Sequence, residues 1–380
     1  MLVKMKTAPL AEWLKKLLVV ADLEATVPAY TNVLFTFAGG VAKLLAYNSL
    51  VGMFECTISE VTGDEGALLL PIKRLAEIVP YLAAPECTIS TDAAVDQEGS
   101  SNVTFKCARY KGVLRSRPAS EFTNLMAYPT PEEQITVFSR EALLSLTERV
   151  KDAVPKDGGK YTVPVGLLEF NEGAATFVGT TGYVLAKTKT DGTFRTPTGA
   201  VPENVTIPKT AFSFLPLLTG ALITFYQTEN AIFFKSETEL LGILQIPATF
   251  PKYNAVIPIA QPVLTISLKL AALTAAIGRM AATTEKEIPL IVFSVTPTGA
   301  EISPLELSTN SKAIGAATDV IDVKAVGAPG TFVLNIDYLK GFIDHAGENV
   351  EIEFITPKTV IKLSSGADFL FYIAPAALAV

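Results

Sequence analysis

The chain has a single histidine, His345, among its 380 residues. Its three cysteines, Cys56, Cys87 and Cys107, form no Cys-x-x-Cys pair and are odd in number. Zinc sites and most acid–base sites draw on several histidines or cysteines, so these shortages remove most catalytic and zinc chemistry. We interpret the cysteines as buried, reduced thiols of a cytosolic fold.

Long apolar runs are also missing. No run approaches the roughly 18–20 residues that a membrane span needs, and Met1–Thr7 lacks the apolar core of a secretory signal. We therefore expect a cytoplasmic protein. With 49% hydrophobic and 18% charged residues the chain is expected to fold, and its length suggests two or three domains. A net charge of −7 argues against a basic coat but permits a local basic stripe.

Motifs of enzyme chemistry are lacking too. Gly158–Thr162 resembles the tail of a phosphate-binding loop, but Val154 occupies the place of the required upstream glycine. There is no Gly-x-Ser-x-Gly, and no pair of carboxylates stands out for acid–base work. His345 follows Asp344 at the end of a predicted helix, where an exposed or capping histidine is the common case. We expect no enzyme activity, no metal and no cofactor.

What the chain does have is one order of elements, repeated three times. Amphipathic or proline-started patterns predict helices at Ala8–Asp22, Pro71–Ala83, Ser139–Val154, Pro208–Gly220, Ser267–Thr284 and Asn335–Ala346. Alternating patterns predict strands at Asn32–Phe37, Val41–Tyr47, Gly52–Ser59, Cys87–Ser90, Asn102–Ala108, Gly112–Ser116, Gly166–Phe170, Ala175–Val178, Leu222–Gln227, Ala231–Lys235, Leu241–Ile246, Pro289–Val295, Ala300–Leu307, Val350–Ile355, Thr359–Leu363 and Asp368–Ile373.

The helices and turns recur at intervals of roughly 125–137 residues, with little identity between passes. This repeat of pattern predicts an α+β fold with three similar domains, each with two helices packed on antiparallel sheets. We place the domains at residues 1–130, 131–258 and 259–380.

The second and third repeats meet at Pro247–Pro258. Its prolines exclude a helix and a central strand, because each lacks a backbone donor and fixes φ. Phe250, Tyr253, Val256 and Ile257 are too apolar for an idle linker. We expect an extended joint whose side chains are packed.

Cations recur on the predicted helices. The set is Lys15, Lys16, Lys73, Arg74, Arg140, Arg149, Lys209, Lys269, Arg279 and Lys340. If the helices share one side of an assembly, these cations could face a polyanion. Ordinary solvated helix faces explain the same pattern equally well.

Five short motifs, in order along the whole chain, resemble the bacterial DNA polymerase III β subunit, the sliding clamp. Phe250–Pro258 is similar to its F-P-x-Y-x-x-V-[LI]-P junction, and Thr180–Ala186 to its T-D-G-H-R-L-A. The other three are Pro71–Leu75, Glu121–Leu125 and Tyr372–Leu378, which resemble the start of a basic helix, an F-P-N-L segment and a Y-[VL]-[VI]-M-P-M-R-L ending.

The resemblance implies three DNA-clamp domains per chain and a closed ring formed by a head-to-tail homodimer. In such a ring helices line a channel around duplex DNA, which is held without sequence readout. The helix cations listed above would be the DNA-binding residues. Further partners would be the polymerase catalytic subunit and the clamp loader, and the function would be that of a processivity factor.

The family also binds short peptides in a cleft between its second and third domains. Carried over by resemblance, that cleft would comprise Pro164, Thr180, Gly182, Tyr183, Val184, Leu185, Pro251, Ala255, Val256, Ile373, Ala374 and Pro375. An apolar cleft at a domain junction suits a short peptide.

The chain departs from the family at several of these positions. Val184 and Ala255 stand where arginines are usual, and Ala374–Leu378 has lost the methionines and arginine of the usual ending. We therefore expect a more apolar cleft with an altered partner peptide. Glu24 stands where an arginine near the channel is often found. The alternative function is a clamp-fold scaffold that gathers proteins but is not loaded on DNA.

Overall fold

The computed structural model describes residues 1–96, 99–124, 126–159, 162–311 and 313–376. Its contacts divide the chain into two compact units. The N-terminal unit consists of Met1–Glu141, Arg195–Pro202 and Thr210–Ile246, and the C-terminal unit of Ala142–Phe194, Glu203–Lys209 and Pro247–Val380. Parts of three sequence motifs fall outside the described residues: Leu125, Lys160 with Tyr161, and the last residues from 377 onwards.

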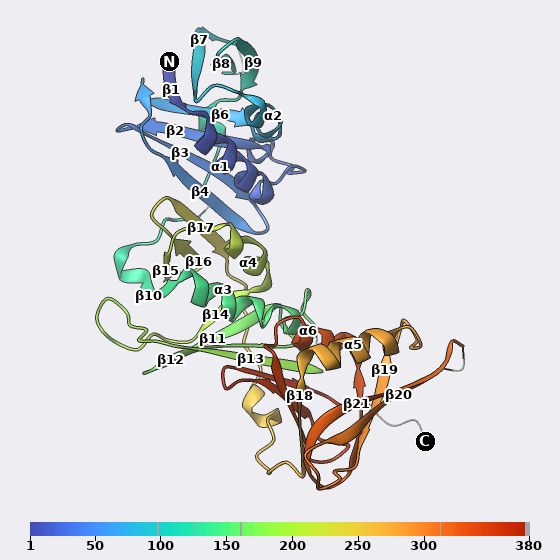
Figure 1. The fold of residues 1–380 in the computed structure, drawn as a ribbon. Coiled ribbons are helices and arrows are strands. Elements are labelled where there is room, and N and C mark those ends of the chain that lie inside the picture. The colour runs from blue at the N-terminus through green and yellow to red at the C-terminus, as the bar shows by residue number, and fades with distance from the viewer. Residues whose placement is uncertain (97–98, 125, 160–161, 312, 377–380) are drawn as a thin grey trace. The chain divides into compact units, whose positions relative to one another are not determined.

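The element order is the same in three successive passes, apart from the two-residue strand β5, which is found in the first pass (Figure 1). The first pass runs β1 (Leu2–Lys6), α1 (Thr7–Val20), β2 (Asn32–Ala38), β3 (Val41–Asn48), β4 (Gly52–Ile58), β5 (Thr62–Gly63), β6 (Gly66–Pro71), α2 (Ile72–Ile78), β7 (Glu86–Val95), β8 (Ser101–Cys107) and β9 (Tyr110–Ser116). The second runs β10 (Gln134–Ser139), α3 (Arg140–Glu148), β11 (Val165–Asn171), β12 (Ala174–Thr180), β13 (Val184–Asp191), β14 (Val205–Pro208), α4 (Lys209–Phe214), β15 (Leu222–Gln227), β16 (Ala231–Lys235) and β17 (Glu239–Leu244). The third runs β18 (Leu264–Lys269), α5 (Leu270–Ala281), β19 (Leu290–Val295), β20 (Ser303–Ser311), β21 (Gly315–Gly327), β22 (Gly330–Asn335), α6 (Ile336–Ile343), β23 (Asn349–Phe354), β24 (Ile361–Ser365) and β25 (Phe369–Ile373).

The strand pairing repeats as well. In each pass the three strands after the first helix form a meander, and the strand before the second helix pairs with the first of them. The three strands after the second helix form another meander, which the opening strand of the pass extends. The α+β class and the threefold repeat predicted from the sequence are confirmed.

Successive passes are joined by strand pairing inside each unit. In the N-terminal unit β17 pairs with β4, so the second pass continues a sheet of the first. In the C-terminal unit β25 pairs with β13, so the third pass continues a sheet of the second. The resulting sheets have five, eight and twelve strands. The domain boundaries near residues 130 and 258 stay predictions.

The helices are shorter than predicted. Each second helix of the first two passes changes into a single 3₁₀ turn, Val79–Tyr81 after α2 and Leu215–Leu217 after α4, with Pro80 or Pro216 inside it. Proline lacks the N–H that the next helical turn needs, so the α-helix ends there. The predicted helix up to Val154 ends at Glu148 and continues as a 3₁₀ turn at Lys151–Ala153.

The predicted helix at Ser267–Thr284 begins too early. Residues 264–269 form strand β18, in which buried Leu264, Ile266 and Leu268 alternate with more exposed neighbours. That alternation has the period of a strand, and pairing with β21 and β23 fixes it. The strands before the other helices, β1, β10, β6, β14 and β22, were also missed, as were β13 and β21.

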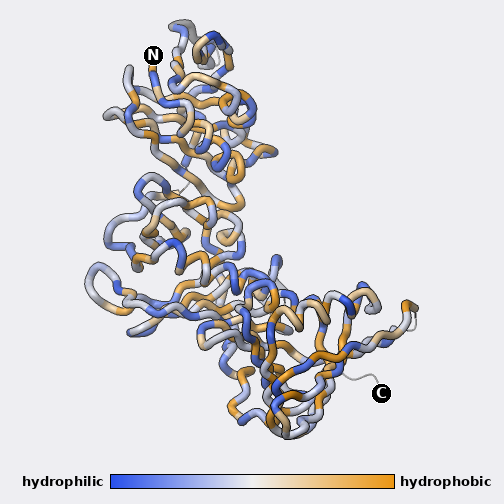
Figure 2. The backbone as a smooth tube through the Cα atoms, in the orientation of Figure 1, coloured by the Kyte–Doolittle hydropathy of each residue, from blue (hydrophilic) through white to orange (hydrophobic). Residues whose placement is uncertain are grey.

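Apolar side chains of the helices and strands make up the cores. One face of α1 is buried, with Leu10, Leu14 and Leu17 at 0% exposure. Figure 2 shows hydrophobic residues along the strands of both units and hydrophilic residues at many of the loops. Within the described residues no helix is long and apolar enough to cross a membrane.

Candidate peptide-binding cleft and helix cations

The turn between β12 and β13 forms one side of a cleft in the C-terminal unit. Threonine hydroxyls hold the turn: Thr180 Oγ1 donates to the Val184 carbonyl at 2.8 Å, and Thr181 Oγ1 accepts from the Val184 amide at 3.2 Å. Gly182 has φ +87°, a left-handed conformation in which a side chain would be strained. The turn therefore presents Tyr183 outwards, with its side chain 63% exposed.

The proline-rich joint forms a second side. Tyr253 begins a 3₁₀ turn at Tyr253–Val256 and is 6% exposed. Its hydroxyl donates to Glu169 Oε2 at 2.6 Å, and the Lys187 ammonium lies 5.7 Å from its ring centre. Burial and then the hydrogen bond to Glu169 raise the pKa of the Tyr253 hydroxyl. The joint is thus fixed to the sheet, as its apolar composition predicted.

The end of the last strand forms the third side. Ile373 is fully buried between its partners Val184 on β13 and Ile361 on β24. Beyond it the Ala374 amide donates to the Tyr183 carbonyl at 2.8 Å, which extends the ladder by one residue. Ala374 therefore lines the cleft, whereas Ile373 is buried in the sheet and does not line it.

Together these three segments enclose a cavity of about 180 Å³. Eight of the twelve carried-over residues line it: Thr180, Gly182, Tyr183, Val184, Leu185, Pro251, Val256 and Ala374. The other four, Pro164, Ala255, Ile373 and Pro375, do not, and the structure adds Lys252, Tyr253, Val360 and Tyr372. Lys252 is the one charged residue among those that line it, so the cavity suits apolar side chains.

A second cavity, of about 390 Å³, shares Tyr183 and Val184 with the first. The ring of Tyr183, on the β12–β13 turn, stacks on the ring of Tyr338, on α6; the ring centres are 5.9 Å apart and the planes differ by 14°. The remaining lining residues are Asp152, Thr181, Asp337, Lys340, Gly341, Asp344 and Phe371. The sequence reasoning missed this cavity, because the contact of α6 with the β12–β13 turn leaves no local signal.

The helix cations are mostly engaged within the chain. Lys16 Nζ lies 3.0 Å from Glu239 Oε1 and 4.4 Å from the Trp13 ring centre. Glu239 is buried and also accepts from the Thr219 amide, Thr219 Oγ1 and Ser236 Oγ, at 2.8, 2.9 and 2.8 Å. Burial would raise the pKa of Glu239, but these donors and Lys16 outweigh it and lower the pKa. Lys16 therefore points at a carboxylate inside the N-terminal unit.

Three other cations serve the fold in the same way. The Arg140 guanidinium donates to the carbonyls of Pro216 and Leu218, at the end of the second pass's 3₁₀ turn. Arg149 pairs with Asp368 at 2.6 Å and covers the Phe369 ring. Lys209 Nζ donates to the Val154 carbonyl, and burial lowers the pKa of its amine.

Four more pair with acids at the surface: Arg74 with Glu77, Lys269 with Glu348, Arg279 with Asp319 and Lys340 with Asp337. Among the described residues Lys15 and Lys73 are exposed without a partner. Of the ten predicted cations, two are thus free lysines, six pair with acids, and Arg140 and Lys209 bind backbone carbonyls.

His345 also has an acidic neighbour. Its Nε2 lies 3.3 Å from Asp152 Oδ2, and its side chain is 15% exposed. This histidine is therefore largely covered, whereas the sequence suggested an exposed or capping residue. The hydrogen bond with His345 holds the pKa of Asp152 below its usual range. Within the described part of the chain no group of acids, histidines and cysteines is arranged to hold a metal ion.

Neither a protein-family profile nor a curated protein matches this sequence. Solved structures do match over the full length. The DNA polymerase III subunit beta of Pseudomonas aeruginosa matches with a TM-score of 0.88 and 19% identity, over 100% of both chains. The DNA polymerase sliding clamp of Bacillus subtilis matches with a TM-score of 0.87 and 18% identity, over 99% of both chains. The beta subunit of Thermotoga maritima matches with a TM-score of 0.83 and 17% identity, over 100% of both.

The chain has the sliding-clamp fold. The resemblance in five short motifs is therefore confirmed at the level of the fold over the whole chain. Within that sliding-clamp fold, the cleft lies in the C-terminal unit, where the second and third passes share a sheet.

Proposed function

We propose that this protein is a DNA sliding clamp, a processivity factor that encircles duplex DNA and tethers a polymerase. The observation that carries the proposal is the full-length sliding-clamp fold, at TM-scores of 0.83 to 0.88. As part of it we propose three clamp domains at residues 1–130, 131–258 and 259–380, a head-to-tail dimeric ring and a cytoplasmic location. The clamp has no catalytic role of its own in this proposal.

Binding of DNA in this ring would depend on closure more than on charge. Two free lysines per chain give four in a dimer, and neutralising four phosphates corresponds to a salt slope of about −4 in log K against log salt. All twenty helix cations of a dimer would give about −18. This weak electrostatic attraction to DNA supports a clamp that stays on DNA because its ring is closed and that slides freely.

Partner proteins would bind in the cleft beside Tyr183 and Tyr253. Its apolar lining, in which Lys252 is the one charged residue, supports a short peptide with aliphatic or aromatic residues. The polymerase and the clamp loader are the partners that we propose for this cleft.

A loading assay tests the proposed function. The protein is incubated with nicked circular DNA, a clamp loader and ATP, and the complex is isolated by gel filtration. We expect retention on the circle and release when one restriction cut makes the DNA linear. A protein that is never retained on the circle would contradict the proposal.

The second candidate is a clamp-fold scaffold that binds proteins but is not loaded on DNA. The pairing of eight of the ten helix cations inside the chain favours it. The exposed Glu24, in place of a cation, favours it too. Peptide binding without retention on DNA would be its signature.

A further inference from the structure

The two cysteines of the five-stranded sheet lie on neighbouring strands and face each other. Cys87 is the second residue of β7, and Cys107 is the last residue of β8. The register of these strands sets Thr88 opposite Lys106, and continuing it by one position sets Cys87 opposite Cys107. Both cysteines are buried, at 1% and 4% exposure. The two thiols are therefore direct cross-strand neighbours.

The backbone hydrogen bonds of Cys87 run to β1, the strand on its other side. Opposite residues of antiparallel strands alternate between hydrogen-bonded and non-hydrogen-bonded pairs. The Thr7 amide donates to the Pro85 carbonyl at 2.9 Å, so these two residues are a hydrogen-bonded pair. Met5 and Cys87, two positions further along the same ladder, are therefore another. Cys87 thus has no ladder bond to spare for β8.

Cys107 uses its backbone groups in the same way, toward β9. Cys107 and Tyr110 close the two-residue turn between β8 and β9, and Ala108 in that turn has φ +52°, in the positive range that such hairpin turns use. The closing residues of this kind of turn form a hydrogen-bonded pair. Cys87 and Cys107 are therefore a non-hydrogen-bonded pair, the closer kind, with Cα atoms about 4.5 Å apart. A disulfide accepts Cα separations of about 4.4–6.8 Å.

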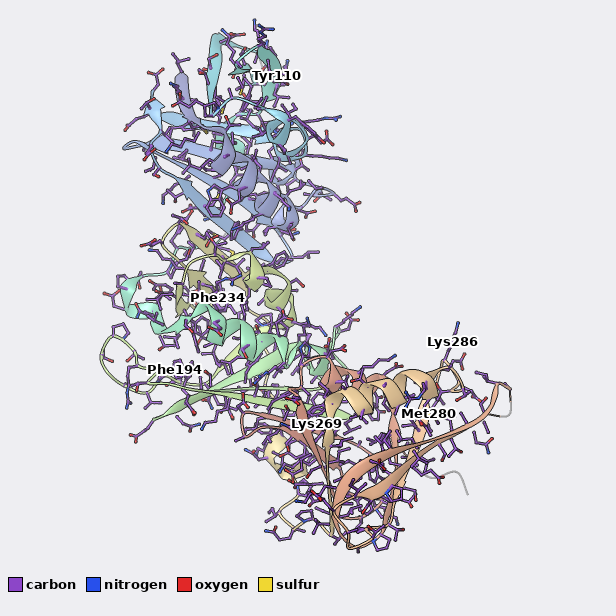
Figure 3. The ribbon with its side chains drawn as sticks, viewed as in Figure 1. Tyr110, Phe194, Phe234, Lys269, Met280 and Lys286 are labelled. Carbon is purple, nitrogen blue, oxygen red and sulfur yellow. The ribbon has the colours of Figure 1, made fainter. Side chains whose placement is uncertain are left out.

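One of the two cysteines lies at the wall of an open hollow. Cys107 lines this hollow, of about 550 Å³, together with Tyr110, which Figure 3 labels beside β8 and β9. The Cys107 thiol donates to the Ala84 carbonyl at 3.8 Å, so it points toward the residues that precede β7. Cys87 is not among the lining residues, and burial raises the pKa of its thiol to about 11. A small reagent in the hollow therefore meets Cys107 first.

We propose that Cys87 and Cys107 form an oxidation site, at which a peroxide converts the two thiols into a cross-strand disulfide. The Cys107 sulfur takes one oxygen of hydrogen peroxide, the O–O bond breaks, and the other oxygen leaves as water. The Cys87 sulfur then attacks the Cys107 sulfur, the S–S bond forms, and the hydroxyl leaves with the Cys87 proton as a second water. Both sulfurs are oxidised and both peroxide oxygens are reduced.

Cys56 is the contrasting cysteine of the same unit. It is fully buried on β4, opposite Leu44 on one side and Glu239 on the other. Its thiol donates to the Leu44 carbonyl at 3.8 Å, and its cross-strand neighbours carry no second thiol. The proposed site therefore depends on the pairing of Cys87 with Cys107 and not on burial alone. It is independent of the proposed clamp function.

Thiol mapping of the full-length protein tests the proposal. The reduced protein is treated with hydrogen peroxide, unfolded, alkylated and digested for mass spectrometry. We expect alkylation at Cys56 alone and a linked pair of peptides carrying Cys87 and Cys107, lighter by about 2 Da than the two reduced peptides together. Dithiothreitol should restore alkylation at all three cysteines. Cys56→Ser is the matched control, and it should form the same disulfide.

Cys87→Ser separates the two steps, because it removes the thiol that attacks the oxidised Cys107. Dimedone, which traps sulfenic acids, should label Cys107 in this variant on the order of tenfold more than in the wild type. The proposal would be overturned by wild-type cysteines that stay reduced in peroxide that oxidises glutathione in the same tube, by a disulfide that includes Cys56, or by equal dimedone labelling of wild type and variant. The wild-type map needs no substitution, so it decides the proposal even for a variant that does not fold.

Discussion

Glu239 provides the sharpest test of how the first two passes are joined. Its carboxylate is buried and takes four hydrogen bonds, one of them from Lys16 on α1. Glu239→Gln keeps the shape and several acceptor positions but removes the charge that pairs with Lys16. Breaking a buried ion pair costs about 3–5 kcal/mol. Because Glu12 lies 3.7 Å from Lys16 as a second acid, we expect a smaller loss of about 2 kcal/mol at pH 7.

The effect should depend on pH. The pKa of Glu239 is lowered in the folded protein, so its stabilising charge is fully present above the unfolded-state pKa and is lost as pH falls through the folded pKa. The difference between wild type and Glu239→Gln should therefore shrink in the acid range below the ordinary glutamate value of about 4.3.

Urea unfolding of the N-terminal unit, followed by Trp13 fluorescence, measures this difference. Trp13 is the chain's single tryptophan and lies beside Lys16. Glu237→Gln is the matched control, since Glu237 is exposed two residues earlier. Equal midpoints for Glu239→Gln and the control at pH 7, or a difference that persists undiminished in acid, would refute the reasoning.

Three further predictions concern the cleft and the lysines. Tyr253→Phe removes the hydrogen bond to Glu169 and should destabilise the C-terminal unit by about 2 kcal/mol. Tyr183→Phe, at an exposed tyrosine of the same unit, should cost less in the same urea titration, and equal losses would contradict the role of the Tyr253 hydroxyl. Val184→Asp puts a charge into the apolar cavity and should weaken the binding of a labelled peptide with aliphatic and aromatic residues at least tenfold, as measured by fluorescence anisotropy. Pro164→Ala, outside the cavity, should leave the affinity unchanged. The reverse order would show that the cleft lies elsewhere. Lys15→Gln with Lys73→Gln should flatten the salt dependence of DNA binding from a slope of about −4 toward zero, and an unchanged slope would show that other cations face the DNA.

Much of the secondary structure could be predicted from patterns of neighbouring residues. The helix α1 and the hairpin β15–β16 are formed by residues that are close together in the sequence. Their hydrophobic periodicity therefore predicted them. The opening strands were not, because β1 pairs with β7 and β18 with β23, more than seventy residues away in each case. The helix predicted at Ser267–Thr284 included the last three residues of β18, residues 267–269, and β1 was not predicted at all.

Residues of the cleft could be predicted only where they belong to a motif that resembles a known pattern. The turn at Thr180–Leu185 and Pro251 could be carried over because their residues resemble a known pattern. Val360 and Tyr338 reach the cavities through strand pairing and helix packing across the unit. Nothing in the chain around them indicates that placement.

For the helix cations, the sequence predicted where they lie but not which groups they contact. Their positions on helices were predicted, yet a sequence does not reveal which acid lies opposite a lysine. Glu239 follows Lys16 by more than two hundred residues, and Asp368 follows Arg149 by a similar span. Which of the predicted cations contact DNA stays a prediction, and the acid partners of Lys16, Arg149 and Lys269 lie too far along the chain to be recognised from the sequence.

The central claim is that this chain closes around duplex DNA. The most direct measurement is retention on circular DNA before and after a single restriction cut, with the protein loaded by a clamp loader and ATP. We expect stable retention on the circle and rapid loss from the linear product, in both low and moderate salt. Equal retention on circular and linear DNA, or none on either, would contradict it.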